Sequence, residues 1–493
     1  MYRLVMYFVF ILWAIAFIFS CFGILPFQPL GMLLSWAAIL TVCYIANELL
    51  ARVFRVPANV ESIYITAFIL MVVLTPGQTT DPLSYWVFLS LVSVLAIASK
   101  FIVTIKKKHI FNPAAFGLTV GAFAISTYAA SWWLGTASML PFVLIGGFLV
   151  VRKIKRVDLA LSFTIAAFAS IAVSAGLRGF DPVTALQNAF LHSPIFFFAS
   201  IMITEPLTTP PTRSMRVIYG ALVGALFAPA IHVGSVHSTP ELVLLVGNVF
   251  TYIVSPKARL MLKLKTKEEL GPDLYDLSFT PDQLMPFKPG QYLEWTLGHG
   301  HPDQRGNRRY FTISSSPTEP EIHMGVKFYT PSSSFKKTLL ALQPGDMIAA
   351  SQLAGEFVLP ADLNKKFVFI AGGIGVTPFR SIIKNAIDTK EKRDAILFYS
   401  ARNPSELVYK EIFDQAVSVG IRTEYVVNDA LPEWNGKTGY ITPEMIMSEV
   451  PDYKDRMFYI SGPRAMVVLF EDTLKKLGIS KRNIKTDFFP GFV

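Results

Sequence analysis

Hydrophobic and polar positions divide this chain into two halves of opposite character. Up to about Pro256, long apolar stretches alternate with short polar breaks, whereas from Lys257 onward charged residues are frequent and apolar runs are short. A helix that spans a bilayer needs roughly 17–25 mainly apolar residues. Windows that meet or approach this length cover residues 4–23, 25–46, 62–80, 82–99, 110–151, 159–177, 182–204, 217–240 and 242–256.

These windows predict a ten-helix transmembrane domain over residues 1–256, because the window 110–151 is long enough for two helices and breaks near 131–135. Lys and Arg gather in the loops 51–60, 100–112, 152–158 and 204–216, and the alternate loops carry only Arg178. This alternation predicts a multi-pass protein of the cell membrane with both termini in the cytoplasm. Two Pro/Thr-rich breaks, 75–82 and 204–210, lie five helices apart and predict two inverted five-helix repeats.

The second half has the pattern of short strands bounded by Gly and Pro, and then of strands alternating with helices. The short strands predict an antiparallel β-barrel domain over residues 257–362, with strands at 260–265, 274–280, 291–297, 310–314, 322–328 and 346–352. The alternation predicts an α/β domain over residues 363–493, with strands at 367–371, 395–400, 422–427 and 457–461 and helices at 379–387, 408–418 and 465–477.

Charge and cysteine content exclude several functions. The net charge is +10, but many of the basic residues sit at the ends of predicted helices, so the pattern favours membrane orientation over nucleic-acid binding. Only Cys21 and Cys43 occur, in successive apolar windows, and they cannot build a disulfide framework or a cysteine-ligated iron–sulfur cluster. We predict no metal site, and any electron relay must use flavin, haem or quinone.

Three segments of the apolar half carry a family resemblance. They are His109–Gly117 (HIFNPAAFG), Ser200–Pro210 (SIMITEPLTTP) and Arg216–Leu222 (RVIYGAL). Taken in order, they resemble the membrane flavoprotein subunits of the sodium-translocating NADH:quinone reductase and of the Rnf complex. The resemblance covers nearly all of residues 1–256 and implies ten helices in two inverted repeats.

One departure from that family changes the expected membrane cofactor. The family attaches FMN covalently to the Thr of a Ser-Gly-Ala-Thr motif, which is absent from this chain. We therefore expect a non-covalent second flavin, FMN or riboflavin, around Asn112, Pro113 and the 204–210 break with Thr204 and Thr208. The alternative is that Asn112 and Pro113 only start a helix, as an N-cap followed by proline at the first position.

The run Arg309-Tyr310-Phe311-Thr312 resembles the flavin signature of the ferredoxin–NADP reductase superfamily, and the resemblance extends over residues 258–493. It implies that Arg309 pairs with the FAD pyrophosphate, that Phe311 lies on the isoalloxazine face, and that Thr312 hydrogen-bonds near the reactive nitrogen. Tyr310 and the following Ser314 are assigned to the same site.

A second phosphate-binding turn is indicated by residues 331–335, where small residues let backbone N–H groups reach an anion. Ser333, Ser334 and Phe335 of this turn, together with Lys327 before it, are assigned to FAD binding. A plain surface loop is the alternative for the turn taken alone.

A glycine-rich turn at 371–378 follows an apolar strand and opens a helix, which is the setting of a nucleotide pyrophosphate site. Gly372, Gly373, Gly375, Thr377 and Pro378 are assigned to NAD(P)H binding.

Three further stretches complete the expected nucleotide site. The run 461–466 resembles the superfamily's Cys-Gly-Pro-x-x-Met segment beside the nicotinamide, with serine in place of cysteine, and the run 399–402 falls where members bind the adenosine ribose. The terminal aromatic resembles the ring that covers the flavin in relatives. The assigned residues are Ser461, Gly462, Pro463, Met466, Ser400, Arg402 and Phe492, and Thr312, Ser461 and Phe492 are the candidate catalytic residues. NADH and NADPH both stay open.

Together these features predict an NAD(P)H-dependent flavin oxidoreductase that transfers electrons through a membrane. NAD(P)H reduces FAD, and electrons pass through a membrane cofactor to a quinone or to an extracytoplasmic acceptor such as flavin, a flavoprotein or ferric iron. One alternative is a redox-driven Na⁺ or H⁺ pump with Glu205, Asp81 or Asp158 as ion ligands. Another is a haem-type ferric reductase using His192 and His232, which the windows place within spans.

Overall fold

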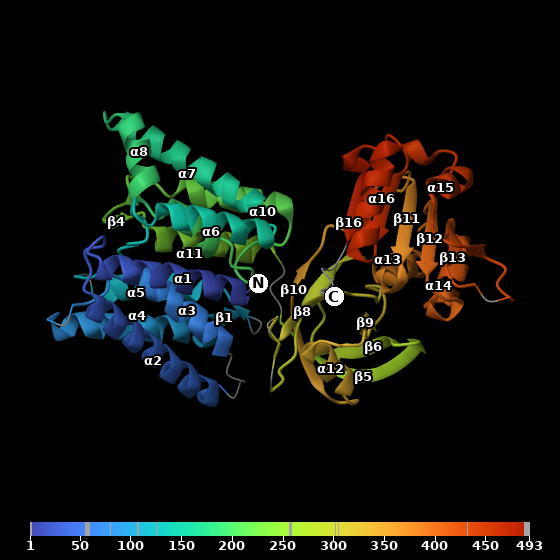
Figure 1. Ribbon diagram of the computed structural model, residues 1–493, viewed down its shortest axis with the longest axis horizontal. Helices are drawn as coiled ribbons and strands as arrows, with labels where there is room; N and C mark the ends of the chain where they lie inside the picture. Colours follow the sequence, from blue (N-terminus) through green and yellow to red (C-terminus); the bar gives the residue numbers. More distant parts are fainter. Residues whose placement is uncertain are drawn as a thin grey trace. The chain divides into compact units, whose positions relative to one another are not determined.

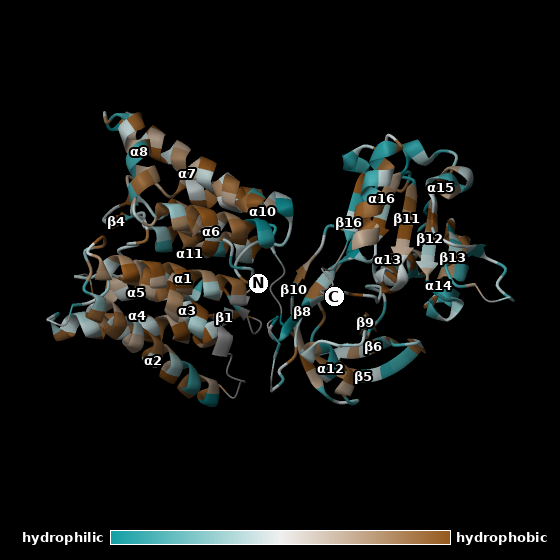
Figure 2. Cartoon of the chain, viewed as in Figure 1, coloured by the Kyte–Doolittle hydropathy of each residue, from teal (hydrophilic) through white to brown (hydrophobic). Residues whose placement is uncertain are grey.

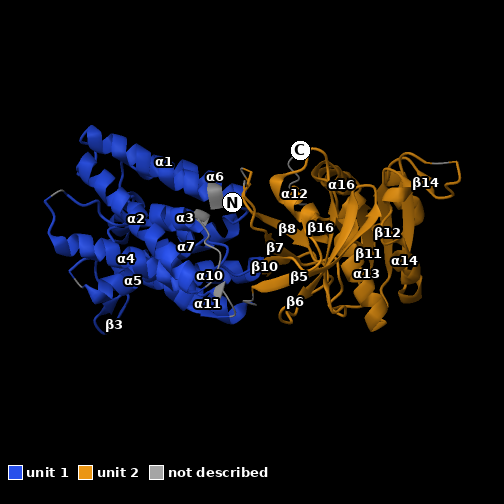
Figure 3. Cartoon of the chain, turned by 90° about the horizontal axis from the view of Figure 1, so that it is seen from below, with its two compact units in different colours: residues 1–258 blue, residues 259–493 orange. Residues whose placement is uncertain are grey.

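The chain forms two compact units, residues 1–258 and residues 259–493, in the computed structural model (Figure 3). The residues described are 2–54, 60–78, 80–105, 108–125, 127–255, 259–300, 302–303, 305–430 and 432–487. The first unit is built almost entirely of helices, and the second contains two six-stranded sheets with covering helices (Figure 1).

Helices in the first unit are apolar around most of their circumference, as the predominance of brown in Figure 2 shows. They are α1 (Tyr2–Cys21), α2 (Pro29–Val53), α3 (Val60–Val73), α4 (Leu83–Ile102), α5 (Pro113–Ala124), α6 (Leu140–Lys153), α7 (Val157–Leu177), α8 (Pro182–His192), α9 (Ile195–Phe197), a π-helical turn (Phe198–Met202), α10 (Arg213–Ala225) and α11 (Pro240–Val254). Two short hairpins accompany them, β1 (Thr104–Ile105) with β2 (Lys108–His109), and β3 (His232–Val233) with β4 (Val236–His237).

Four helices among the described residues are long and apolar enough to cross a membrane, namely α1, α2, α4 and α7. A fifth span results if α8 and the bent segment Ile195–Met202 count as one, with a bend of 61° between them. Shorter apolar helices cover Ser62–Val73, Pro113–Ala124 and Pro240–Val254. The first unit therefore has the apolar helices of a membrane domain, and the count of ten stays a prediction.

Glycines bring two helix pairs of this unit close together. A Cβ built on Gly220 of α10 would lie 2.9 Å from the carbonyl oxygen of Leu159 in α7, and one on Gly224 would lie 2.4 Å from that of Phe163. On α5, a Cβ on Gly117 would lie 2.6 Å from the carbonyl oxygen of Val92 in α4. Small residues at such contacts let helix backbones approach, which is how helices associate in lipid.

The interpretation of His232 as a residue within a span is wrong. Helix α10 ends at Ala225, and His232 lies exposed in the β3–β4 hairpin, where its ring centroid is 5.2 Å from that of His237. His192 is the last residue of α8 and is also exposed. Proline at 229 and glycine at 234 interrupt the apolar window, and both residues favour turns over helix.

The first sheet of the second unit is antiparallel throughout. Its strands are β5 (Leu260–Gly271), β6 (Leu274–Pro281), β7 (Tyr292–Thr296), β8 (Arg308–Thr312), β9 (Ile322–Lys327) and β10 (Met347–Ala354), in the order β8-β7-β10-β5-β6-β9. Each of the six predicted strands is present. Alternate residues such as Leu262, Phe279, Trp295 and Met324 form its core, against which the helix α12 (Ser334–Ala341) packs Phe335. Closure of the sheet into a barrel stays a prediction.

The second sheet is parallel and is covered on both faces (Figure 1). Its strands are β11 (Phe367–Gly372), β12 (Ala395–Ala401), β13 (Ile421–Val427), β14 (Lys437–Thr438), β15 (Met457–Ser461) and β16 (Ile484–Asp487), in the order β14-β13-β12-β11-β15-β16. Helices α13 (Thr377–Thr389) and α14 (Lys410–Gln415) cover one face, and α15 (Pro443–Glu449) and α16 (Arg464–Lys476) cover the other. The sheet builds outward in both directions from β11, so a topological switch point lies between β11 and β15.

Candidate functional site

The predicted flavin motif lies on β8, where strand geometry separates its members. Arg309 and Phe311 share one face: the guanidinium carbon of Arg309 lies 5.2 Å from the ring centroid of Phe335, and the Phe311 ring lies 6.0 Å from it. Tyr310 points to the other face, where its hydroxyl donates a hydrogen bond of 2.6 Å to Glu294. Successive side chains of a strand alternate in direction, so Tyr310 is not brought together with Arg309 and Phe311.

The second predicted phosphate turn lies beside Arg309. Ser333 caps α12 by accepting a bond from the Lys336 backbone N–H, and the Ser334 hydroxyl oxygen accepts one of 2.9 Å from the N–H of Asp303. Asp303 also accepts a bond of 3.0 Å from Nη2 of Arg309. Asp303 thus joins the two motifs, with its backbone N–H bonded to Ser334 and its carboxylate bonded to Arg309.

Two basic residues to which the sequence analysis gave no role, Arg305 and Lys336, belong to the same cluster as Arg309. Burial, and then the positive charges of Arg305 and Arg309, lower the pKa of Lys336 to about 8. Three cations close enough to oppose one another's charge suit a doubly charged anion such as a pyrophosphate. The only sequence signal for Lys336 was its position three residues beyond Ser333.

Thr312 provides a further test of whether a flavin fits. Its side chain is 4% exposed, and its Oγ1 has no hydrogen-bond partner among the described residues. A buried hydroxyl with no partner costs free energy unless a ligand supplies one. Phe311 precedes it directly on β8, so the motif offers FAD an aromatic ring and the basic cluster on one face of the strand and, at the end of the strand, an unpaired buried hydroxyl on the other.

The glycine-rich turn lies at the switch point of the parallel sheet. Gly372 ends β11, residues Gly373–Val376 form a 3₁₀ turn, and Thr377 and Pro378 begin α13. Gly373 has φ of +52° and no atom within 4 Å of a Cβ built on it, so its backbone is open to a ligand. Ligands of open α/β sheets bind at this edge, beside the helix N-terminus.

Residues 461–466, after β15, form the other wall of this site. A Cβ on Gly372 would lie 2.3 Å from Sδ of Met466, and Pro463 also approaches Gly372. Ser461 is buried at the end of β15. The structure thus brings both predicted nucleotide segments together, although about 90 residues separate them in the chain.

The remaining predicted cofactor residues are two for the nucleotide, Ser400 and Arg402, and two for the flavin, Lys327 and Phe492. Ser400 and Arg402 lie at the end of β12, and Nε of the exposed Arg402 lies 3.0 Å from the Asp429 carboxylate at the end of β13. Lys327 is paired with Glu406 at 2.7 Å. Phe492 lies outside the described residues.

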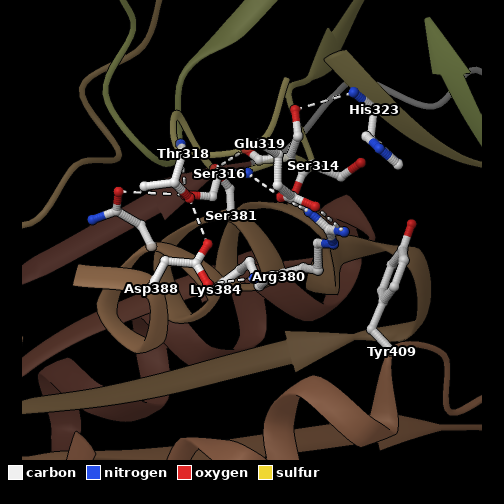
Figure 4. A network of polar contacts seen from close by, with 12 residues as sticks. Ser314, Ser316, Thr318, Glu319, His323, Arg380, Ser381, Lys384, Asp388 and Tyr409 are labelled. Carbon is white, nitrogen blue, oxygen red and sulfur yellow. Dashed lines mark hydrogen bonds and ion pairs between the residues drawn. The ribbon is translucent and has the colours of Figure 1, made fainter. Parts of the chain in front are cut away.

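A polar network joins the segment after β8 to α13 (Figure 4). Arg380 donates a bond of 3.0 Å to the carbonyl of Ser314 and pairs with Glu319. Farther along α13, Ser381 donates to the carbonyl of Ser315 at 2.6 Å. The helix that begins at the nucleotide turn is therefore bonded directly to the segment that follows the strand of the flavin motif.

In the first unit, two of the four residues predicted for the membrane flavin gather on one carboxylate. Nδ2 of Asn112 and Oγ1 of Thr208 donate to Glu205 at 2.8 and 3.0 Å, and Nε2 of His109 lies 3.7 Å from Glu205. Thr204 instead donates to a carbonyl of its own helical turn at 2.8 Å. Asn112 also caps α5, with Pro113 at its start, so the N-cap interpretation holds alongside the polar cluster.

Comparison with known proteins agrees with this geometry. Residues 369–472 match the family described as an oxidoreductase NAD-binding domain. The chain is 26% identical over 254 residues to a flavohemoprotein of Rhodopirellula baltica, covering 48% of this chain and 60% of that protein. It is 32% identical over 200 residues to the F component of the Na⁺-translocating NADH-quinone reductase of Actinobacillus pleuropneumoniae, covering 37% of this chain and 49% of that protein.

The chain thus spans about half the length of the curated relatives it matches. Among solved structures, the Amycolatopsis cytochrome P450 reductase GcoB is 22% identical, with a TM-score of 0.43 over 48% of this chain and 70% of that one. The predicted class, an NAD(P)H-dependent flavin oxidoreductase with FAD and NAD(P)H as cofactors, is confirmed for the second unit. The resemblance of residues 1–256 to membrane flavoprotein subunits stays a prediction.

Proposed function

We propose that this protein is a membrane oxidoreductase that moves electrons from NAD(P)H, through FAD, into and across a lipid bilayer. Its domains would be the transmembrane domain 1–256, the FAD domain 257–362 and the NAD(P) domain 363–493. The contact of the glycine turn 372–376 with residues 461–466, in the same chain as the apolar helices, carries this proposal. FAD supplies the step that accepts a hydride and gives up electrons one at a time.

The protein's own residues supply binding and orientation. Arg309, Lys336 and the Ser333–Ser334 turn bind the FAD pyrophosphate, Phe311 supports the flavin ring, and Thr312 offers the unpaired hydroxyl. Gly373 admits the nucleotide pyrophosphate to the N-terminus of α13. The bonds between α13 and the segment after β8 hold the two cofactor sites in a fixed relation.

The first unit is proposed to span the cell membrane with both termini in the cytoplasm. Helix α7 supports this, because it carries an apolar stripe that no described residue covers. Leu161, Ile165, Val173 and Leu177 recur at multiples of four residues and are 56, 67, 61 and 84% exposed. Packing also supports two five-helix repeats. Helix α1 contacts α3, α2 contacts α4 and α4 contacts α5, and in the second half α6 contacts α9, α7 contacts α10 and α10 contacts α11.

A second, non-covalent flavin in this domain is part of the proposal. The hydrocarbon core is about 30 Å thick, so an intermediate carrier is needed between FAD and the far side. The cluster of Asn112, Thr208 and Glu205 is the proposed place, since it offers amide and hydroxyl groups within an apolar domain. We propose a quinone or an extracytoplasmic flavin, flavoprotein or ferric iron as acceptor; the name of the relative from Actinobacillus supports the quinone.

Sealed proteoliposomes test this function. An impermeant dye oxidant is enclosed, the NAD(P) domain faces outward, and NADH or NADPH is added outside. We expect the enclosed dye to be reduced, and to be reduced more slowly at sub-saturating NADH or NADPH in liposomes made with the Gly375→Ala variant, whose nucleotide binding should be weakened. Transmembrane transfer would be contradicted if the bound FAD of the outward-facing domains were reduced while the enclosed dye stayed oxidised. Flavin content of the full chain and of residues 1–258, with acid precipitation, counts the second flavin and tests covalent attachment.

A redox-driven cation pump is the second candidate, and the surroundings of Glu205 favour it. Of the three acids considered, Asp158 already pairs with Arg216 at 2.8 Å, and Asp81 accepts a turn bond of 2.6 Å from the Gln78 N–H. The Glu205 carboxylate lies among the hydroxyl and amide groups of Thr208 and Asn112, and its nearest cationic partner is the titratable His109, with Nε2 3.7 Å away. Stimulation of NAD(P)H oxidation by Na⁺ in wild type but not in Glu205→Gln vesicles would support pumping, and equal rates with and without Na⁺ would exclude a Na⁺ pump.

A further inference from the structure

Tyr409 has a strained backbone and contacts both halves of the second unit, residues 259–493, which we call the reductase unit. The halves are the antiparallel sheet and the parallel sheet, each with its helices. Tyr409 precedes α14 with φ of 61° and ψ of 22°, the left-handed region that bulky residues rarely adopt. Its hydroxyl donates a hydrogen bond of 2.7 Å to Oδ1 of Asp276 in β6, and the guanidinium of Arg380 lies 5.5 Å from its ring centroid. A strained residue persists where its surroundings over-determine it, and such residues gather at functional sites.

The Tyr409 hydroxyl and the nucleotide turn both approach Gly325 of β9, in the antiparallel sheet that carries the flavin motif (the flavin sheet). A Cβ built on Gly325 would lie 2.7 Å from the Tyr409 hydroxyl, 2.6 Å from Cγ2 of Thr377 and 3.4 Å from Cδ1 of Ile374. Thr377 and Ile374 belong to the turn that opens the nucleotide site. The absence of a side chain at Gly325 therefore lets the turn and the tyrosine rest directly on β9.

Asp276 is a suitable anchor for this tyrosine. Its side chain is buried, and it accepts bonds from Tyr409, from Nδ1 of His323 and, at 3.5 Å, from the hydroxyl of Ser314. Burial opposes its ionisation, but the bonds from His323 and Tyr409 and the charge of Arg380 hold its pKa below the usual range. The bond from Tyr409 is thus made to a carboxylate at neutral pH, and charge-assisted bonds are stronger and shorter than neutral ones.

We propose that Tyr409 is a positioning residue for hydride transfer, and that its hydroxyl on Asp276 seats the turn 373–377 on β9. The proposal rests on the function proposed above and adds a residue that no motif marks. If the turn is displaced, the nicotinamide is displaced with it, because the turn binds the pyrophosphate of the same nucleotide. Hydride transfer needs the reacting atoms in close alignment, and a misplacement of about 1 Å costs on the order of 10²-fold in rate.

The test compares two tyrosine-to-phenylalanine variants of the full chain. Tyr409→Phe keeps the ring near Arg380 and removes the hydroxyl. Tyr425→Phe is the matched control, because the Tyr425 hydroxyl also donates a 2.7 Å bond to an aspartate, Asp414. That bond and a longer one to the Lys410 carbonyl both lie within the parallel-sheet half of the unit. Anaerobic stopped-flow bleaching of the flavin by NADH and NADPH gives the limiting rate, the nucleotide concentration at half-maximal rate and, with 4-deuterated nucleotide, the isotope effect.

We expect Tyr409→Phe to lower the limiting rate about 10- to 100-fold, with a larger isotope effect, an unchanged half-saturating concentration and full FAD content. Tyr425→Phe should match wild type. A Tyr409→Phe protein that unfolds at lower temperature but bleaches at the wild-type limiting rate would show a merely structural role and overturn the proposal. If Tyr409→Phe does not fold, Asp276→Asn serves instead, and a wild-type limiting rate in that variant overturns the proposal equally. Wild-type flavin that neither nucleotide bleaches would contradict the proposed function itself.

Discussion

Gly375 and Gly462 approach each other so closely that a Cβ built on Gly375 would lie 2.6 Å from the Cα of Gly462. They belong to the two loops that follow β11 and β15, the neighbouring strands at the switch point of the parallel sheet. Real Cβ atoms do not approach other atoms so closely, so any side chain at position 375 must push the 461–463 backbone away from the nucleotide turn.

We therefore expect Gly375→Ala to impair nucleotide binding and to leave FAD in place. The half-saturating concentration of NAD(P)H in flavin bleaching should rise about 10-fold or more, equivalent to about 1.4 kcal/mol of binding free energy. Gly298→Ala is the control, because no atom lies within 4 Å of a Cβ built there. An unchanged half-saturating concentration in Gly375→Ala would mean that the nucleotide does not bind between these loops.

Thr312 should contribute through its unpaired hydroxyl. Thr312→Ala removes a group that is 4% exposed and has no partner among the described residues. We expect about a 10-fold slower bleaching of FAD, since one hydrogen bond is worth about 1 kcal/mol and more when its partner is charged. Thr312→Ser keeps the hydroxyl and should restore most of the rate. If Thr312→Ala and wild type bleach at equal rates, the Thr312 hydroxyl has no role in the reduction of FAD.

FAD affinity should fall as pH rises through about 8, because the pKa of Lys336 is lowered to about 8 by burial and by Arg305 and Arg309. Below pH 8 the lysine is charged and attracts the pyrophosphate; above it the charge is lost at a pH where a free lysine would keep it. Bound FAD raises this pKa again, so binding takes up a proton between about pH 8 and 10.

Fluorescence titration of the deflavinated full chain from about pH 7 to 10 measures the affinity. We expect Lys336→Met to bind FAD about 10-fold more weakly at pH 7, as expected for one charge-assisted bond, and to lose the pH dependence. Lys336→Arg should bind tightly throughout, because a guanidinium stays charged. A wild-type affinity independent of pH would place Lys336 outside the FAD site.

Asp429 should favour NADH over NADPH. Its carboxylate holds Nε of Arg402 at 3.0 Å, and both side chains are exposed at the carboxyl ends of β13 and β12. A carboxylate at this edge can accept a hydrogen bond from the ribose 2′-hydroxyl of NADH. An arginine that is not paired with a carboxylate can instead bind the 2′-phosphate of NADPH. We expect wild type to prefer NADH, and Asp429→Asn to shift the kcat/KM ratio about 10-fold toward NADPH. A ratio that the substitution leaves unchanged would show that the pair lies away from the ribose.

Much of the reductase unit was predictable because its signals are local. Strand alternation located the six antiparallel strands, and the glycine turn preceded the predicted helix 379–387, which begins two residues earlier, at Thr377, as α13. The strands β14 and β16 and the helix α15 were missed, because they are short and carry little periodicity. Tyr310 was assigned to the flavin from its place in a motif, although the alternation of a strand turns it toward Glu294.

The sequence by itself determined the apolar and polar halves, the order of the motifs and the chemistry each motif brings, because these depend on residue type and on spacing of a few positions. Only the tertiary structure decided which residues meet. Asp276 and Tyr409 lie 133 residues apart in the chain, and no local pattern relates them. Their bond exists because β6 of one sheet and the start of α14 on the other are packed together by the whole unit, and packing between distant segments is set by the sum of many contacts.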